Sequence, residues 1–154
     1  EINMQSVLIN RSVLVGENLN FDINLKFNPD YNLFMKIAAL YPVGVLQDPL
    51  VKYRVLRNSL SSQTLSIAAD ENRYTLDALY KSSDDVRVTY KTDFGKAYAK
   101  LHYYCAVDAL YSKERIQALK ALSPVIFKKI EYFILSILLI IGFPISIILK
   151  ILGR

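Results

Sequence analysis

The segment from Tyr132 to Leu149 constrains the fold of this 154-residue chain more than any other, because it contains no charged side chain. A helix of these residues would rise about 27 Å, close to the ~30 Å thickness of the hydrocarbon core of a bilayer. Glu131 and Lys150 bracket the run. The segment therefore predicts a transmembrane helix over residues 132–150, followed by a short tail of residues 151–154 that is cytosolic if the preceding domain is lumenal.

Two residues inside this run, Gly142 and Pro144, would break a helix in water, but a bilayer tolerates both. Pro144 predicts a kink in the membrane helix, and Gly142 predicts a close contact with a neighbouring helix. Lys128 and Lys129 precede the run, and their ammonium groups can extend toward lipid headgroups. A helix buried in a soluble core is the alternative. This alternative is disfavoured because a domain with only ~130 other residues is rarely large enough to surround a helix that is apolar on every face.

Alternation of apolar and polar residues dominates the first hundred residues. From Leu19 to Phe27 every second residue is apolar and the residues between them are polar, which is the pattern of a half-buried strand. Roughly seven or eight such strands, with turn residues about every 10 positions, are typical of an immunoglobulin-like sandwich. The other predicted strands cover residues 6–15, 33–40, 50–56, 63–69, 73–80, 86–91 and 97–107, and a helix stays an alternative for the fifth of these.

We therefore expect an all-β, immunoglobulin-like β-sandwich over residues 1–111. Residues 112–131 are predicted to be a juxtamembrane helical connector. Within that connector, Ser112–Leu122 has helical spacing, Ser112 can cap the start of the helix, and Ser123 with Pro124 marks its end.

Charge and cysteine content exclude some classes of protein. The net charge of +5 is spread along the chain, and the sequence has no long run of Lys and Arg, so we expect no contact with nucleic acid. The single cysteine, Cys105, excludes a disulfide within the chain. The predicted domain must then be stable through its own core.

The sequence offers no recognisable active site. His102 is the one histidine, and in a strand it would lie on the opposite face from Cys105, so the two do not predict a catalytic or metal-binding pair. The acidic pairs Asp70–Glu71 and Asp84–Asp85 lack the alternating spacing of a calcium loop. We therefore expect a protein that is not an enzyme and that holds no cofactor and no metal.

Asn10 begins the tripeptide Asn-Arg-Ser, which is an acceptor sequence for N-linked sugar. About one such tripeptide is expected by chance in a chain of this composition. Its place in a predicted strand would also lower its accessibility. Asn10 is thus a candidate glycosylation site only if the domain lies in the secretory lumen.

Three pieces of the sequence, in order, resemble the beta subunit of the translocon-associated protein (TRAP) complex, also called signal sequence receptor beta. The first is the stretch from Ser6 to Asp30, where the matching positions are Leu8, Asn10, Arg11, Gly16, Leu19 and Asn28. The second is Ser123–Pro124 ahead of the apolar run, and the third is Ile-Gly-Phe-Pro at residues 141–144.

This resemblance implies a lumenal sandwich on a single-pass helix in the endoplasmic reticulum membrane. The chain would be a non-catalytic subunit that assists co-translational protein translocation and membrane-protein topogenesis at the ribosome-bound Sec translocon. Its implied partners are the other TRAP subunits, the Sec translocon channel, membrane lipid and, indirectly, the ribosome.

The charges beside the apolar run favour a different orientation. Within ~20 residues of the run, more basic residues precede it than follow it, which by the positive-inside rule places the domain in the cytosol. The five that precede it are Lys113, Arg115, Lys120, Lys128 and Lys129, and the two that follow are Lys150 and Arg154. The alternative is therefore a tail-anchored membrane protein with a cytosolic β-sandwich interaction domain.

Overall fold

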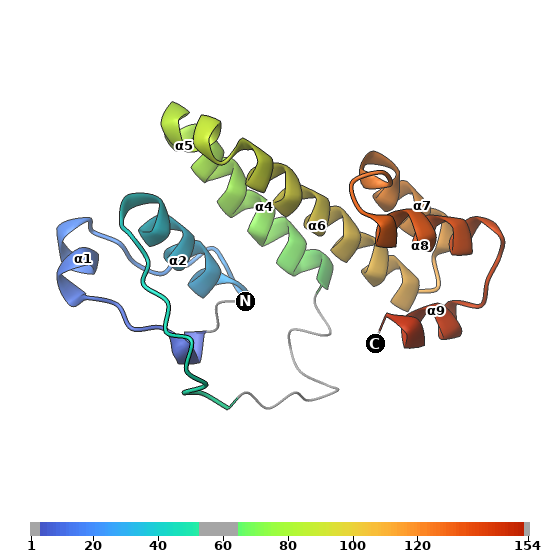
Figure 1. Cartoon of the computed structure of the whole chain (residues 1–154), viewed down its shortest axis with the longest axis horizontal. Coiled ribbons are helices and arrows are strands. Elements are labelled where there is room, and N and C mark those ends of the chain that lie inside the picture. The colour runs from blue at the N-terminus through green and yellow to red at the C-terminus, as the bar shows by residue number, and fades with distance from the viewer. Residues whose placement is uncertain (1–3, 53–64, 153–154) are drawn as a thin grey trace.

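The computed structural model describes residues 4–52 and 65–152, and every regular element in these two ranges is a helix. The predicted immunoglobulin-like β-sandwich is therefore wrong, and the described chain has an all-helical fold (Figure 1). Parts of the predicted strands over residues 50–56 and 63–69 lie outside the described residues. The elements are η1 (Met4–Ser6), α1 (Arg11–Gly16), α2 (Pro29–Leu40), α4 (Leu65–Ser82), α5 (Asp84–Thr89), α6 (Lys91–Tyr111), α7 (Arg115–Leu122), η2 (Ser123–Val125), α8 (Ile130–Ile140) and α9 (Ile145–Ile151).

Helices α4 and α6 form an antiparallel pair, and α5 reverses the chain between them (Figure 1). The apolar residues Leu65, Ala69, Leu76 and Leu79 of α4 recur at intervals of three, four and seven, so they lie on one side of a helix, and all four are buried. Alternation at shorter range had predicted strands here. The segment forms a helix because the helical spacing of these four residues gives it one continuous apolar side to bury.

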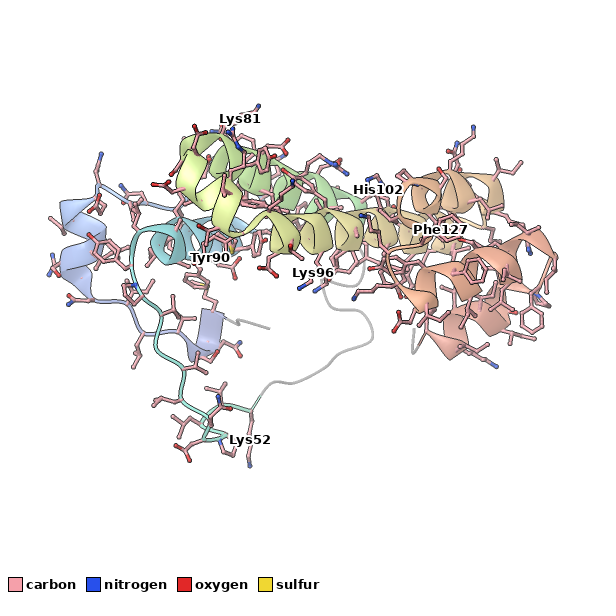
Figure 2. All side chains as sticks on the ribbon, turned by 45° about the horizontal axis from the view of Figure 1, so that its top comes forward. Lys52, Lys81, Tyr90, Lys96, His102 and Phe127 are labelled. Carbon is pink, nitrogen blue, oxygen red and sulfur yellow. The ribbon has the colours of Figure 1, made fainter. Side chains whose placement is uncertain are left out.

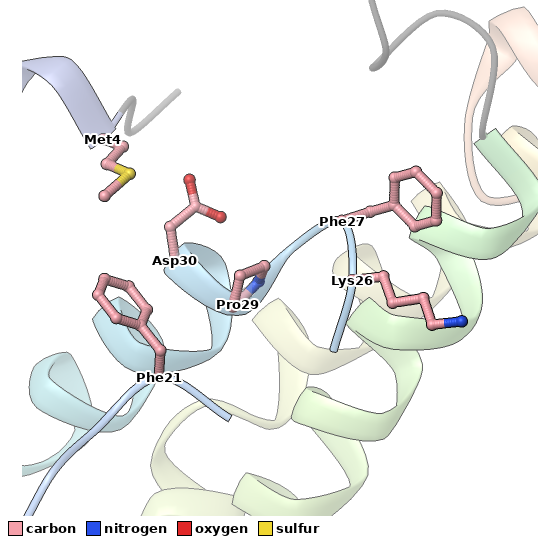
Figure 3. Close-up of a pocket in the computed structure, with 6 residues that line it drawn as sticks. All are labelled: Met4, Phe21, Lys26, Phe27, Pro29 and Asp30. Carbon is pink, nitrogen blue, oxygen red and sulfur yellow. The ribbon is translucent and has the colours of Figure 1, made fainter. Parts of the chain in front are cut away.

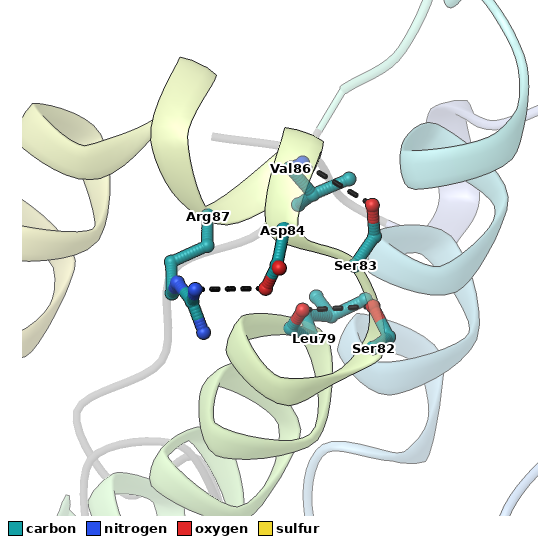
Figure 4. A network of polar contacts seen from close by, with 6 residues as sticks. All are labelled: Leu79, Ser82, Ser83, Asp84, Val86 and Arg87. Carbon is teal, nitrogen blue, oxygen red and sulfur yellow. Dashed lines mark hydrogen bonds and ion pairs between the residues drawn. The ribbon is translucent and has the colours of Figure 1, made fainter.

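A polar network at the end of α4 helps to separate it from α5 (Figure 4). The Ser82 hydroxyl donates to the backbone carbonyl of Leu79 at 2.8 Å, and the Ser83 side chain caps α5 by accepting from the Val86 N–H at 3.5 Å. Asp84, in the first turn of α5, pairs with Arg87 at 2.7 Å. The predicted strand over residues 86–91 therefore spans the end of a short capped helix, α5, and the first residue of α6.

Helix α6 joins two separate apolar clusters, because its 21 residues rise about 31 Å. Near its start, Phe94 packs edge-on against Tyr80 of α4 with ring centroids 5.3 Å apart. Toward its end, Ala106 and Leu110 are completely buried among residues of α7, α8 and α9. The predicted strand over residues 97–107 is thus the middle of the longest helix in the described part of the chain.

The segment before α2 does not form the predicted strand over residues 19–27. Asp22 instead closes a local turn by accepting from the backbone N–H of Asn24 at 3.0 Å. Phe21 and Ile23, which alternation had placed on a buried face, are exposed. A short polar side chain that accepts a hydrogen bond from the backbone two residues later favours a turn over a strand. In this segment the turn forms.

Glu71 of α4 fastens this segment to the helical pair. Its carboxylate accepts three backbone N–H groups, from Lys26 at 2.7 Å, Phe27 at 3.0 Å and Asn28 at 2.8 Å. The buried Asn32 of α2 also donates to Thr75 at 2.9 Å. The carboxylate that the sequence offered as half of an acidic pair is therefore used to hold the chain just ahead of α2.

The apolar run over residues 132–150 folds as two short helices, so the predicted transmembrane helix is wrong. Helix α8 ends at a left-handed Gly142, whose φ is 80°. The Gly142 N–H donates to the Leu139 carbonyl at 3.3 Å and the Phe143 N–H to the Leu138 carbonyl at 3.0 Å, which is the Schellman motif that ends many helices. Pro144 then caps the start of α9.

None of the described helices combines the length and the apolar character that crossing a bilayer requires. Helix α8 has 11 residues, which rise about 16 Å, roughly half the thickness of the hydrocarbon core. This finding overturns the single-pass location in the endoplasmic reticulum membrane. The run is as apolar as its composition indicates, but Gly142 ends the helix here, whereas we had expected a bilayer to tolerate it.

Candidate functional site

The most unusual surface of the described chain is a stripe of large apolar side chains on α8 and the residue after it. Their exposed fractions run from 36% at Phe133 to 68% at Ile140. The stripe consists of Ile130, Phe133, Ile134, Ile137, Ile140 and Ile141. These positions recur at intervals of three and four, so they share one side of the helix. We call them the apolar stripe.

The opposite side of α8 is held firmly by the protein. Tyr132, Leu135 and Leu139 are buried, and the Tyr132 ring stacks on Tyr103 of α6 with centroids 5.3 Å apart. Ser136 is buried as well, and its hydroxyl donates to the Tyr132 carbonyl at 2.9 Å. Because α8 is apolar on both sides, packing against α6 and α7 covers one side and leaves the stripe in solvent.

Arg115 of α7 fixes the corner between α8 and α9. Its guanidinium donates to the Leu139 carbonyl at 2.9 Å and to the Phe143 carbonyl at 2.8 Å. Carbonyls at the end of a helix lack partners within it and carry partial negative charge, so a cation there is favourable. The sequence had counted Arg115 only as one of the charges beside the membrane, and its role as a clamp depends on contacts 24 and 28 residues away.

Exposed lysines lie at one end of this helical hairpin. Lys128 and Lys129 precede α8, and Lys150 lies in the last turn of α9. Figure 1 shows α9 running back below α8, so the start of α8 and the end of α9 share one end of the hairpin. Lys129 also lies 5.8 Å from the centre of the Tyr132 ring. Glu131 is the acidic residue in the first turn of α8.

Phe127 extends the apolar surface beyond α8. Phe127, labelled in Figure 2, is 85% exposed. Its ring centroid lies 5.9 Å from that of Phe133. On α9, Ile147 and Ile151 are exposed as well. Scattered exposed apolar residues are normal, whereas large exposed apolar patches are typical of interaction surfaces.

A second exposed apolar stretch follows α2. Every residue from Pro42 to Lys52 is exposed, including Val45 and Leu46, and Figure 1 shows this stretch leaving the helical body as a coil. It adjoins a hollow of about 530 Å³ lined by residues 38–43 and Tyr90. Nothing in the described structure indicates what would cover this stretch.

A smaller hollow of about 360 Å³ lies beside the start of α2 (Figure 3). Its walls combine one cation and one carboxylate with apolar side chains; they are Met4, Phe21, Lys26, Phe27, Pro29 and Asp30. Its polar groups do not converge on one point: Figure 3 shows Lys26 and Asp30 on opposite sides of the backbone at Pro29. The hollow therefore has no feature that selects a ligand.

The residues with the most reactive side chains do not form a catalytic centre. His102 and Cys105 both lie on α6, where a spacing of three puts them on the same side of a helix, the reverse of the strand prediction. They form no hydrogen bond with each other, and burial raises the pKa of the Cys105 thiol, which disfavours the reactive thiolate. Among the described residues no group of three or more His, Cys, Asp or Glu side chains could hold a metal ion.

The three residues singled out in the sequence have local structural positions. Asn10 is exposed and caps α1, with its side-chain oxygen accepting from the backbone N–H of Ser12 at 3.0 Å. Gly142 and Pro144 form the corner between α8 and α9, and a Cβ added at Gly142 would meet nothing within 4 Å. Within the described chain Gly142 therefore makes no close helix contact, and the predicted contact with a helix of another protein stays a prediction.

Comparisons with known protein families, with curated proteins and with solved structures found no match to this chain. The apolar stripe is the feature that sequence reasoning missed. Its signal was present, because residues 130, 133, 134, 137, 140 and 141 are all large and apolar at helical spacing. Nearly all the remaining residues of the run are apolar as well. The sequence therefore does not show which side of the helix is buried and which is exposed.

Proposed function

We propose that this chain is a non-catalytic docking module that binds its partner through the apolar stripe of α8. The observation that carries the proposal is the exposure of six large apolar side chains on one side of a helix whose other side is buried. Burying such side chains releases about 25 cal/mol for each Å² removed from water, so a partner that covers the stripe gains a strong driving force.

The contacts that hold α8 in place on its buried side support this function. Helix α8 is stacked on α6 through Tyr103 and Tyr132, and its end is clamped by Arg115. A surface held in place before binding loses little conformational entropy when its partner arrives. The stripe is thus suited to act as a preformed binding face.

The test uses nonionic detergent micelles, which offer an apolar phase without charge. We expect the full chain to bind dodecyl maltoside micelles in density-matched sedimentation, and the double variant Ile134→Ser/Ile137→Ser to bind at least tenfold more weakly. Ile67→Ser is the matched control, because Ile67 is 46% exposed on α4, compared with 49% for Ile134 and 41% for Ile137. Circular dichroism checks that all variants keep their helices.

Equal micelle binding by the double variant and the control would show that the stripe is not the docking face. A wild-type chain that binds no micelles would contradict the proposal directly.

The more specific function implied by the resemblance to the TRAP beta subunit stays a prediction. It required a β-sandwich on a membrane-spanning helix, and the described residues form neither. The tail-anchored alternative required the same span. The non-catalytic binding role that both share is the part that α8 supports, through its exposed apolar stripe.

A further inference from the structure

We propose that the partner of the apolar stripe is the surface of a bilayer that contains anionic lipid, with α8 lying in the plane of the membrane. This inference rests on the docking function proposed above and names the occupant of the same face. Three observations support it: the chemistry of the stripe, the dimensions of α8, and the position of the lysines.

The exposed side of α8 offers hydrocarbon and almost nothing else. Apart from Glu131 in its first turn, each exposed residue of α8 is Ile or Phe. Protein–protein interfaces carry about one hydrogen bond per 100–200 Å² and mix polar groups with apolar ones. The stripe has no side-chain donor or acceptor to offer such a partner, whereas the acyl region of a bilayer requires none.

The dimensions of α8 fit a helix on a membrane rather than a helix across it. Its length of about 16 Å covers half of the hydrocarbon core. Its buried side is fixed to α6 through the Tyr103–Tyr132 stack, so the helix cannot enter the bilayer without the domain. Helices of this kind lie in the interface with their apolar side buried about 5–10 Å below the headgroups.

The charges at the edge of the stripe complement an anionic surface. Lys128, Lys129 and Lys150 are all exposed at one end of the α8–α9 hairpin, and the chain carries a net charge of +5. Long lysine side chains can bury their hydrocarbon stems while the ammonium groups meet lipid phosphates. Each lysine near an anionic surface strengthens binding about fivefold, so three contribute on the order of 100-fold.

The absence of tryptophan from the sequence permits a site-specific test. In Ile137→Trp the single indole reports on the stripe, and in Ile67→Trp it reports on a matched exposed position of α4. Both full-length variants are mixed with vesicles of phosphatidylcholine alone or with added phosphatidylserine. The probes are the indole emission spectrum and its quenching by brominated acyl chains.

We expect the indole at position 137 to shift to shorter wavelength and to be quenched by brominated lipid, and the indole at position 67 to do neither. We also expect the triple variant Lys128→Gln/Lys129→Gln/Lys150→Gln to lose most of the preference for phosphatidylserine, on the order of 100-fold in vesicle affinity. Equal binding of the wild-type chain to both vesicle types would overturn the anionic preference.

The micelle and vesicle results together separate the two proposals. A chain that binds micelles through the stripe but binds neither vesicle type would refute the membrane inference and leave the docking function standing, with a protein as its partner. Self-association through the stripe in sedimentation, without vesicle binding, would identify a second copy of the chain as the occupant and would also refute the inference. Failure with micelles and vesicles alike would overturn both proposals.

Discussion

Replacing Gly142 by alanine tests the corner that divides the apolar run. Gly142 has a φ of 80°, and an added Cβ would meet nothing within 4 Å, so the cost is that of the backbone conformation alone. A left-handed conformation costs an L-residue about 1–2 kcal/mol relative to its usual conformations. For a chain of this length, that lowers the melting temperature by roughly 2–8 °C.

The sign of this effect distinguishes the observed corner from a continuous helix. Inside a continuous helix alanine is favoured over glycine by roughly 1 kcal/mol, so the same substitution would stabilise the protein. Gly95 provides the matched control, because it lies within α6, is exposed and also has open space around its Cα. We expect Gly95→Ala to raise the free energy of unfolding by about 0.5–1 kcal/mol.

Urea unfolding of both variants, followed by far-ultraviolet circular dichroism, supplies the measurement. The corner predicts opposite changes in the unfolding midpoint, down for Gly142→Ala and up for Gly95→Ala. A Gly142→Ala variant as stable as the wild type, or more stable, would refute the left-handed Schellman ending of α8.

Three further predictions concern the rest of the fold. Glu71→Gln removes the charge from an acceptor of three backbone N–H groups, and we expect a loss of about 1–3 kcal/mol in urea unfolding. Leu110→Ala empties a completely buried site and should cost about 2–5 kcal/mol, whereas Leu8→Ala, at a 99% exposed position, should change stability by less than about 0.5 kcal/mol. Burial and the 2.6 Å hydrogen bond to Asp77 raise the pKa of Tyr98 above its ordinary value of 10.0. The folded state therefore favours the neutral phenol, and the stabilisation it provides is complete below pH ~10 and declines as the pH rises further. Tyr98→Phe should accordingly lose less stability than the wild type between pH ~9 and ~11, which unfolding curves at several pH values would show.

The first hundred residues alternate like strands, yet every regular element in their described part is a helix. In the segment from Arg73 to Tyr80 both the alternating and the helical period can be found, and a short helix was an open alternative. The neighbouring helix α6 decides between the two periods. Helix α4 buries Leu76 and Leu79 against α6, so the helical arrangement is the one that removes apolar area from water. No local count of apolar residues contains that information.

The amino-acid sequence by itself contains the signal that divides the apolar run, although we had expected a continuous membrane helix to tolerate it. Gly142, followed two residues later by Pro144, is a helix-ending signal that local backbone sterics enforce in water. The helix predicted within Ser112–Leu122 is present as well, although it begins at Arg115 because Lys113 adopts a positive φ of 59°. Such features depend on residues close together in the chain, which is why they can be read from it.

Only the tertiary structure decided which side of α8 is covered and which remains in solvent. Both sides are largely apolar in sequence, and the choice follows from contacts with Tyr103 of α6 and Arg115 of α7. The capture of the segment ahead of α2 by Glu71 is of the same kind, since it joins residues more than 40 positions apart. Burial and long-range hydrogen bonds are properties of the assembled chain, because each requires a partner that local sequence does not specify.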